Sequence, residues 1–226
     1  MNTIRTRVLA GVIITFCQAA YPQGFINLGF EDATIVRDPS GLYPAAVYAS
    51  SAIPGWTPTS ILGSKDILYN DVFLGATGVS IFDRSGSFPV INGAFSIQLY
   101  GGTGVATGAS ISQTSLVPVD AVSILFKAQY GNGGIPVGTL LVSLGGQNIP
   151  FSAISTGPNY SLYGGDVSAF AGQMEQLMFT APPGANNYWE LDDIQFSPQS
   201  IPEPSVLGLS ALGAFLLGWR LLGRRR

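Results

Sequence analysis

The residue types that this chain lacks limit the chemistry it can perform. Its 226 residues contain no histidine, and its one cysteine is Cys17, near the N-terminus. The absence of histidine excludes Ser-His-Asp triads, histidine-based metal centres and the commonest general base. From residue 21 onward the sequence has no thiol nucleophile, no disulfide and no thiolate zinc site. Carboxylates and aromatic rings remain as the candidate functional groups.

Carboxylates could act in catalysis if two of them flanked a substrate. A glycosidase places two carboxyl groups on either side of the scissile bond. Asp192 and Asp193 are adjacent, so in a regular strand they would point to opposite faces and could not form that pair. Glu175 and Glu190 are a conceivable pair, but no local pattern supports it. We therefore expect a protein that is not an enzyme.

Several aromatic residues lie in or beside expected loops and are candidates for ligand binding. They are Trp56, Tyr160, Tyr163, Tyr188 and Trp189. Exposed aromatic faces stack on sugar rings, so these residues could form a glycan-binding platform. The alternative for each residue is packing in the core of the domain or at its rim.

The charge of the central region restricts its partners. Residues 21–200 contain four basic and twelve acidic residues, a net charge of −8. Like charges repel, so we expect no binding to nucleic acid or to anionic polymers. Cations and neutral glycans remain compatible with this charge.

Short alternating runs between turn residues dominate the region 21–200, and long amphipathic helical patterns are absent. This pattern predicts an all-β fold, an antiparallel β-sandwich of the jelly-roll type. Turns are expected at 38–41 and 53–56, and one helical turn at 166–172; residues 45–51 are ambiguous. Strands are expected at 25–30, 66–70, 79–83, 95–100, 109–116, 122–128, 139–144, 175–180 and 189–197.

The N-terminal residues 1–20 have the pattern of a signal peptide. Arg5 and Arg7 precede an apolar run at 8–16, and small residues allow cleavage after Ala19 or Ala20. Cys17 could indicate a lipoprotein, but the residue before it, Phe16, is too bulky for the usual lipobox. We therefore expect ordinary export of the domain 21–200.

The C-terminal residues 201–226 combine three features. Pro202, Glu203 and Pro204 are followed by an apolar run at 206–222 and then by the arginines Arg224, Arg225 and Arg226. As a helix, the apolar run would span about 26 Å, close to the thickness of a bilayer core. The terminal arginines should remain cytoplasmic.

This order of features resembles the PEP-CTERM sorting signal, which joins a Pro-Glu-Pro triplet, a short transmembrane helix and an arginine-rich end. The resemblance implies that an exosortase, a membrane protease, acts near residues 202–204. It also implies a membrane-anchored form before processing, and the cell surface or the extracellular matrix as the later location. The alternative is an ordinary tail anchor.

Three short motifs resemble those of the galactose-binding-like β-sandwiches, which include many carbohydrate-binding modules. The motifs are Asn-Leu-Gly-Phe-Glu at 27–31, Ile-Pro-Gly-Trp at 53–56 and Leu-Asp-Asp-Ile at 191–194. The resemblance implies a structural Ca²⁺ held by oxygen ligands from Glu31, Asp192 and Asp193, provided that the first and last strands lie side by side. Alternatively, these carboxylates simply face water.

Together these features predict an exported, non-enzymatic protein of the envelope or of extracellular polysaccharide, with glycan as the candidate ligand. A structural matrix protein without a ligand and a carbohydrate-active hydrolase are the alternatives. Exposed, clustered aromatic residues would favour glycan binding, and their complete burial would favour a structural role. A cleft with two carboxylates roughly 5–10 Å apart would favour the hydrolase.

Overall fold

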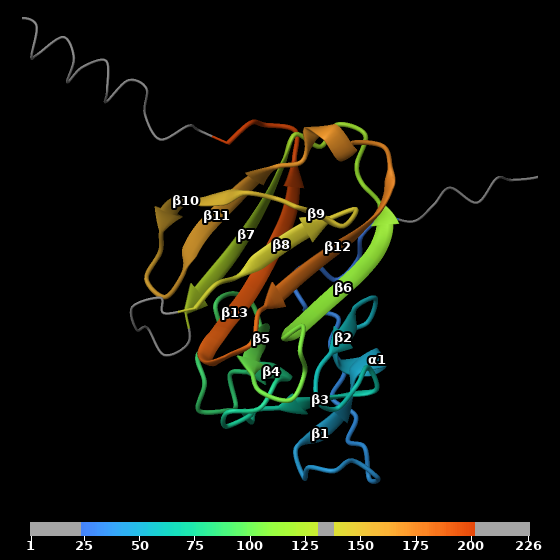
Figure 1. Ribbon diagram of the computed structural model, residues 1–226, viewed down its shortest axis with the longest axis vertical. Helices are drawn as coiled ribbons and strands as arrows, with labels where there is room; N and C mark the ends of the chain where they lie inside the picture. The colour runs from blue at the N-terminus through green and yellow to red at the C-terminus, as the bar shows by residue number, and fades with distance from the viewer. Residues whose placement is uncertain (1–23, 131–137, 202–226) are drawn as a thin grey trace, which may run out of the picture.

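Alternation of apolar and polar residues along short strands builds two sheets that face each other. The computed structural model describes residues 24–130 and 138–201 (Figure 1). The expected signal peptide, the triplet 202–204, the membrane helix 206–222 and the terminal arginines lie outside the described residues. Within the described ranges, no helix is long and apolar enough to cross a membrane.

The larger sheet has eight strands among the described residues. Neighbouring strands pair antiparallel, except for β3 and β4, which are parallel. In spatial order they are β1 (Ala46–Tyr48), β3 (Asp66–Tyr69), β4 (Gly78–Asp83), β5 (Phe95–Gly102), β13 (Gly184–Ser197), β7 (Ser123–Tyr130), β11 (Ser161–Asp166) and β10 (Phe151–Thr156).

The smaller sheet has five strands and packs against one face of the larger sheet (Figure 1). In spatial order they are β2 (Thr57–Thr59), β6 (Ala109–Leu116), β12 (Met174–Ala181), β8 (Leu141–Leu144) and β9 (Gln147–Asn148). A single helical turn, α1 (Ala49–Ala52), follows β1, and a short 3-10 helix, η2 (Ser168–Phe170), precedes β12.

The main core lies between the sheets and is rich in aromatic side chains. Phe126 of β7 meets Phe179 of β12 with ring centroids 5.2 Å apart, and Trp56 lies 6.4 Å from the same ring of Phe179. Burial of such large apolar side chains is the main favourable contribution to folding. The observed architecture therefore confirms the prediction of an all-β sandwich.

A second, smaller core lies on the outer face of the larger sheet. Ala45, Leu68 and Phe73 form it, and Leu62, Ala76 and Tyr100 pack against them. The ring of Phe73 lies so close to Gly78 that a Cβ atom there would be 1.8 Å from it. Farther along the same face, Phe88 stacks on Phe82 at 4.5 Å. The loops that carry Phe73 and Phe88 therefore cover part of this outer face.

Most of the predicted strands are present. Residues 109–116 form β6 as expected, and β3, β4, β5, β7, β8, β12 and β13 overlap the other predicted ranges. The turns at 38–41 and 53–56 are confirmed by the bonds from Gly41 N to Asp38 O and from Trp56 N to Ile53 O. The helical turn expected at 166–172 is η2.

The strand predicted at 25–30 is wrong. Asn27 has φ 50° and Phe30 has φ 60°, and these left-handed conformations break an extended backbone. Five strands were not predicted: β1, which lies in the ambiguous stretch 45–51, and β2, β9, β10 and β11. Pro58 obscured β2, Gly164 and Gly165 obscured β11, and β10 alternates poorly because it contains a bulge.

Candidate functional site

Four polar side chains form one row across the outer face of the larger sheet. Ser80 of β4 lies opposite Gln98 of β5, Gln98 lies opposite Glu190 of β13, and Glu190 lies opposite Gln129 of β7. Their neighbours along the strands, such as Ile97 and Leu191, point into the main core. Because side chains alternate along a strand, these four point away from it. We call them the polar row.

Three of the four members of the polar row are buried, and the row is incompletely hydrogen-bonded. Ser80, Gln98 and Glu190 are 1%, 5% and 1% exposed. Gln129 Nε2 donates to Glu190 Oε2 at 2.6 Å. Ser80 Oγ, Gln98 Oε1 and Glu190 Oε1 have no hydrogen-bond partner among the described residues. A buried polar atom without a partner costs about 1–3 kcal/mol, so three in one row identify a place suited to hydrogen-bond donors.

Two buried carboxyl groups lie on this face, two residues apart on β13. Burial raises the pKa of Glu190 to about 7; the hydrogen bond from Gln129 opposes the rise, and the charge of Asp192 adds to it. Burial also raises the pKa of Asp192 to about 7, against the opposing hydrogen bonds of Ser96 and of two backbone N–H groups. Perturbed carboxyl groups of this kind are frequent at functional sites.

A stack of three tyrosine rings adjoins the polar row. The ring of Tyr188 lies 5.1 Å from that of Tyr100 and 5.0 Å from that of Tyr130, and both pairs are nearly parallel. Tyr100 and Tyr188 are half-buried. Tyr100 follows Gln98 by two residues and Tyr188 precedes Glu190 by two, so strand alternation places both on the outer face. Tyr100 packs on the second core there, whereas Tyr188 also reaches Tyr130 and the main core at the end of β7. This stack is the aromatic end of the candidate site.

The five aromatic residues singled out from the sequence do not form one platform. Trp56 and Trp189 are 4% and 5% exposed and belong to the main core. Tyr163 stacks on Phe126, with ring centroids 5.5 Å apart. Their positions favour the packing alternative for these three residues.

The other two predicted aromatic residues lie elsewhere. Tyr160 holds Lys127 Nζ 5.0 Å from its ring centroid. Tyr188 has a ring on each side, so a sugar could contact its edge but not stack on its face. Tyr100, which the sequence reasoning missed, is stacked on one ring only, although it also packs on the second core, so its exposed part is the better candidate for contact with a sugar. Its signal was the set Ser96, Gln98 and Tyr100 on the polar face of the predicted strand 95–100.

Glu31 and Asp192 hold the same loop from two sides. The Glu31 carboxylate accepts hydrogen bonds from Ala94 N at 2.9 Å and from Phe95 N at 3.3 Å. Asp192 Oδ2 accepts from Asn92 N and from Ser96 Oγ, both at 2.9 Å. These two predicted metal ligands are therefore brought to one place, around residues 92–96.

The first and last segments lie side by side, as the calcium expectation requires. Ile194 N donates to Leu28 O at 3.0 Å, and the rings of Phe25 and Phe196 stack at 5.1 Å. The contact does not need a regular first strand, because the 25–30 segment runs beside the bulge of β13 as an irregular stretch that ends in a turn at 28–30.

Asp193 is directed elsewhere. A bulge interrupts β13 between Asp192 and Gln195, and Asp193 has φ 48°. Asp193 Oδ2 lies 2.8 Å from Lys127 Nζ. Partial burial raises the pKa of Asp193, but hydrogen bonds from Lys127 and Gln195 lower it below its usual value. Asp193 is thus the partner of Lys127 and does not join Glu31.

The expectation that Asp192 and Asp193 point to opposite faces is wrong. Asp192 reaches Ser96 and Asp193 reaches Lys127, and both partners lie on the outer face. The extra residue of the bulge breaks the strict alternation of the strand.

The conceivable pair of Glu175 and Glu190 is not formed. Glu175 belongs to β12 in the smaller sheet, where its carboxylate lies over Gly145. Glu190 belongs to β13 in the larger sheet, and its neighbouring carboxyl group is Asp192. The Glu-Leu-Asp order at 190–192 was the signal for this pair, because residues two apart in a strand share a face.

Comparison of the sequence with known protein families and curated proteins found no relative of this chain. No protein-family model matches this sequence, and no curated protein matches it.

Within residues 24–130 and 138–201, no group of three or more acidic, histidine or cysteine side chains is close enough to hold a metal ion. A cation between Glu31 and Asp192 would therefore need backbone carbonyl or water oxygens to complete its shell.

Proposed function

We propose that this chain is an exported, non-enzymatic protein of the cell envelope or of extracellular polysaccharide, and that it binds a neutral glycan on the outer face of its larger sheet. One observation carries the ligand proposal. The polar row has three buried oxygen atoms without hydrogen-bond partners, and it adjoins the partly buried ring of Tyr100. Sugar hydroxyl groups donate hydrogen bonds, and sugar rings stack on aromatic faces.

The charge supports a neutral ligand. Residues 21–200 carry a net charge of −8, and the carboxyl groups of Glu190 and Asp192 lie on the same face as the polar row. An anionic polysaccharide or a nucleic acid would be repelled. Because the polar row is buried, the proposed ligand approaches it through the tyrosine stack and the edges of the covering loops.

The proposed location rests on the sequence of the two ends. Residues 1–20 direct export, and an exosortase-type membrane protease recognises Pro202, Glu203 and Pro204. The helix 206–222 holds the chain in the membrane until processing, with Arg224–Arg226 on the cytoplasmic side. The extracellular polysaccharide is the proposed partner after processing. These roles are supported by the order of the three C-terminal features in the sequence.

The ligand proposal can be tested with a glycan array and the full chain in detergent. Tyr100→Ala should abolish binding of the glycan that the wild type retains. Tyr43→Ala is the matched control, because Tyr43 is also partly exposed but lies in the loop before β1. Equal binding by both variants, or no binding by the wild type, would contradict the proposal.

A structural matrix protein without a ligand is the second candidate. The observation that favours it is the burial of Trp56 and Trp189 in the main core, which removes the two largest rings from any binding face. A failed array with intact export would favour this candidate.

Catalysis is not proposed. Glu190 and Asp192 are two residues apart on one strand face, with Cα atoms about 6.6 Å apart, so they are the carboxyl pair to consider for glycosidase chemistry. Both oxygens of Asp192, however, already accept hydrogen bonds from the protein, Oδ1 from Asp193 N and Oδ2 from Asn92 N and Ser96 Oγ, so this carboxyl group is not directed at a substrate.

A further inference from the structure

The sandwich has four sheet edges among its described residues, and three of them are protected. A free edge presents unpaired backbone groups and invites pairing with another chain. Residues 36–38 cover β1 through the bonds from Asp38 N to Ala46 O and from Tyr48 N to Val36 O. The edge strand β2 has three residues, and its Pro58 lacks a backbone donor. The edge strand β9 has two residues.

The fourth edge strand, β10, has no covering segment and no proline, and it is longer than β2 and β9. Its one irregularity is a bulge. It has six residues, Phe-Ser-Ala-Ile-Ser-Thr, with no proline and no charge. Its pairing with β11 shifts between Ala153 and Ser155. Ser152, Ala153, Ser155 and Thr156 are exposed, and these small side chains leave room for another backbone to approach. The strand therefore has both the length and the side chains to accept a partner.

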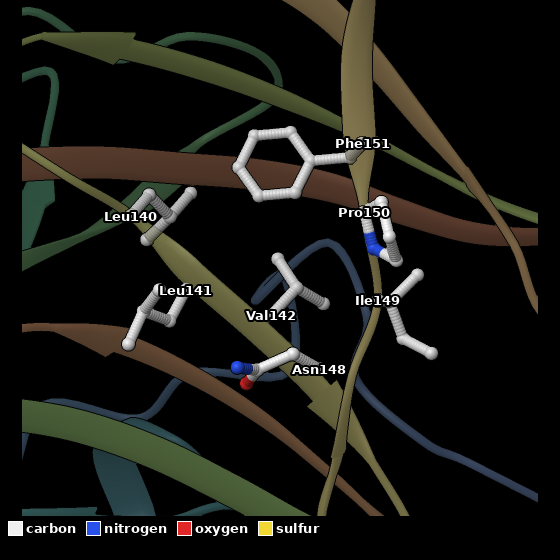
Figure 2. A pocket seen from close by; sticks show the side chains of 7 residues that line it. All are labelled: Leu140, Leu141, Val142, Asn148, Ile149, Pro150 and Phe151. Carbon is white, nitrogen blue, oxygen red and sulfur yellow. The ribbon is translucent and has the colours of Figure 1, made fainter.

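An apolar cleft lies beside this edge. The chain crosses from β9 in one sheet to β10 in the other through Ile149 and Pro150, and a cleft of about 220 Å³ opens between this corner and β8. In Figure 2 the ring of Phe151 extends from β10 toward Leu140. Leu141 of β8 is 39% exposed at the same place. Apolar contact could thus add to backbone pairing.

The occupant of this edge can be inferred from charge. The sequence has no charged residue between Lys127 and Asp166, and this stretch supplies β8, β9, β10 and all of β11 except its last residue, Asp166. Elsewhere, residues 21–200 carry a net charge of −8. Two copies of an acidic chain repel each other least where both surfaces are uncharged. This edge is therefore the surface at which the chain can best meet a second copy.

We propose that two copies of this chain associate here, with β10 of one copy pairing antiparallel to β10 of the other about a two-fold axis. A two-fold axis brings the same patch of both copies together and makes the paired strands antiparallel. Stable interfaces bury about 1,600 Å² in total, more than one short edge supplies. The association is accordingly weak in dilute solution and favoured where the chain is concentrated, as on a membrane.

Disulfide crosslinking of the full chain in its membrane tests this proposal. With Cys17 replaced by serine, single cysteines are placed at Ser152, Ala153, Ser155 and Thr156 in turn. A disulfide requires Cα atoms within about 7 Å, so the position nearest the two-fold axis should give a crosslinked dimer on oxidation. Thr59→Cys on the protected edge β2 is the matched control. If no β10 position crosslinks more than Thr59→Cys, the proposal is overturned.

A charged residue introduced on β10 tests whether the crosslinked dimer forms by specific β10–β10 pairing or by random collision of two copies. In the background of the cysteine that crosslinks best, a lysine at another exposed β10 position should lower the dimer fraction at least about tenfold, because like charges then meet across the axis. Thr59→Lys should leave it unchanged. Persistence of the dimer with the β10 lysine would show that another face is used. Crosslinking only in a chain that ends at Ile201 would show that residues 202–226 cover the edge, which also contradicts the proposal.

Discussion

Glu31 and Asp192 lie 161 positions apart in the sequence, yet they hold the two ends of one short loop. Glu31 accepts hydrogen bonds from Ala94 N and Phe95 N, and Asp192 accepts them from Asn92 N and Ser96 Oγ. The charge of Glu31 also raises the pKa of Asp192, although burial is the largest cause of that rise. Two carboxylates this near each other favour a cation or a proton between them.

A structural Ca²⁺ at this place predicts a calcium-dependent melting temperature. Binding only to the native state stabilises it, by about 2.7 kcal/mol when free calcium is a hundredfold above the dissociation constant. A chelator should lower the melting temperature of the protein, and excess calcium should restore it. Glu31→Gln should remove most of this response, whereas Asp32→Asn, next to it and exposed, should keep it. The same melting temperature with chelator and with millimolar calcium would exclude the site.

Asp83 predicts a loss of stability in acid. Burial of Asp83 raises its pKa, but hydrogen bonds from Asn70, Ser85 and Tyr69 lower it well below the ordinary 3.8. The stabilisation is therefore complete above pH 3.8 and is lost as pH falls from there toward the folded-state pKa, because the unfolded chain binds the proton first. Asp83→Asn should lower the melting temperature at pH 7.

The difference between Asp83→Asn and the wild type should shrink below pH 3.8, and thermal denaturation across pH 2–7 measures it. Asp71→Asn on the neighbouring exposed loop is the control, with a melting temperature close to wild type throughout. A constant difference at all pH values would mean that the contribution of Asp83 does not depend on its ionisation.

Gly108 and Gly146 have nearly the same backbone conformation but different surroundings. Replacing each by alanine therefore distinguishes the cost of a steric clash from the cost of backbone strain. Gly108 has φ 80° and Gly146 has φ 75°. A Cβ atom on Gly108 would lie 2.1 Å from Ala181 O, whereas one on Gly146 would meet nothing within 4 Å. Gly146→Ala should cost about 1–2 kcal/mol from the left-handed conformation alone. Gly108→Ala should lower the free energy of unfolding, measured by urea denaturation, clearly more than Gly146→Ala. Equal losses would show that the backbone around Gly108 shifts to accommodate the Cβ atom.

The C-terminal triplet predicts a processing defect when it is changed. Replacing Pro202, Glu203 and Pro204 by alanine should leave a longer, membrane-held form in the native host, because the protease no longer recognises the junction. Immunoblots of membrane and extracellular fractions measure this. Changing Pro182 and Pro183, in the described domain, to alanine is the control for loss of proline elsewhere. Identical size and fractionation of triplet variant and wild type would contradict a sorting role.

Local pattern was sufficient for the class of fold and for much of its strand content. The alternation at 95–100 and 122–128 sorts apolar side chains to one face, and the structure buries Ile97 and Phe126 in the main core as that alternation requires. The Pro-Gly pair before Trp56 and the Asp-Pro-Ser-Gly run at 38–41 determine their turns by local backbone preference. These features depend on residues close together in the chain, so the sequence alone determines them.

Contacts between distant segments decided the rest, including the candidate site. Asn27 and Phe30 leave the extended conformation although their segment alternates like a strand. The bulge at Asp193 shifts the pairing of β13 with β7 and turns Asp193 toward Lys127. The polar row requires four strands in one register, and the edge position of β10 depends on the order of all eight strands. Sheet register and order come from packing of the whole chain, which local residue patterns do not specify.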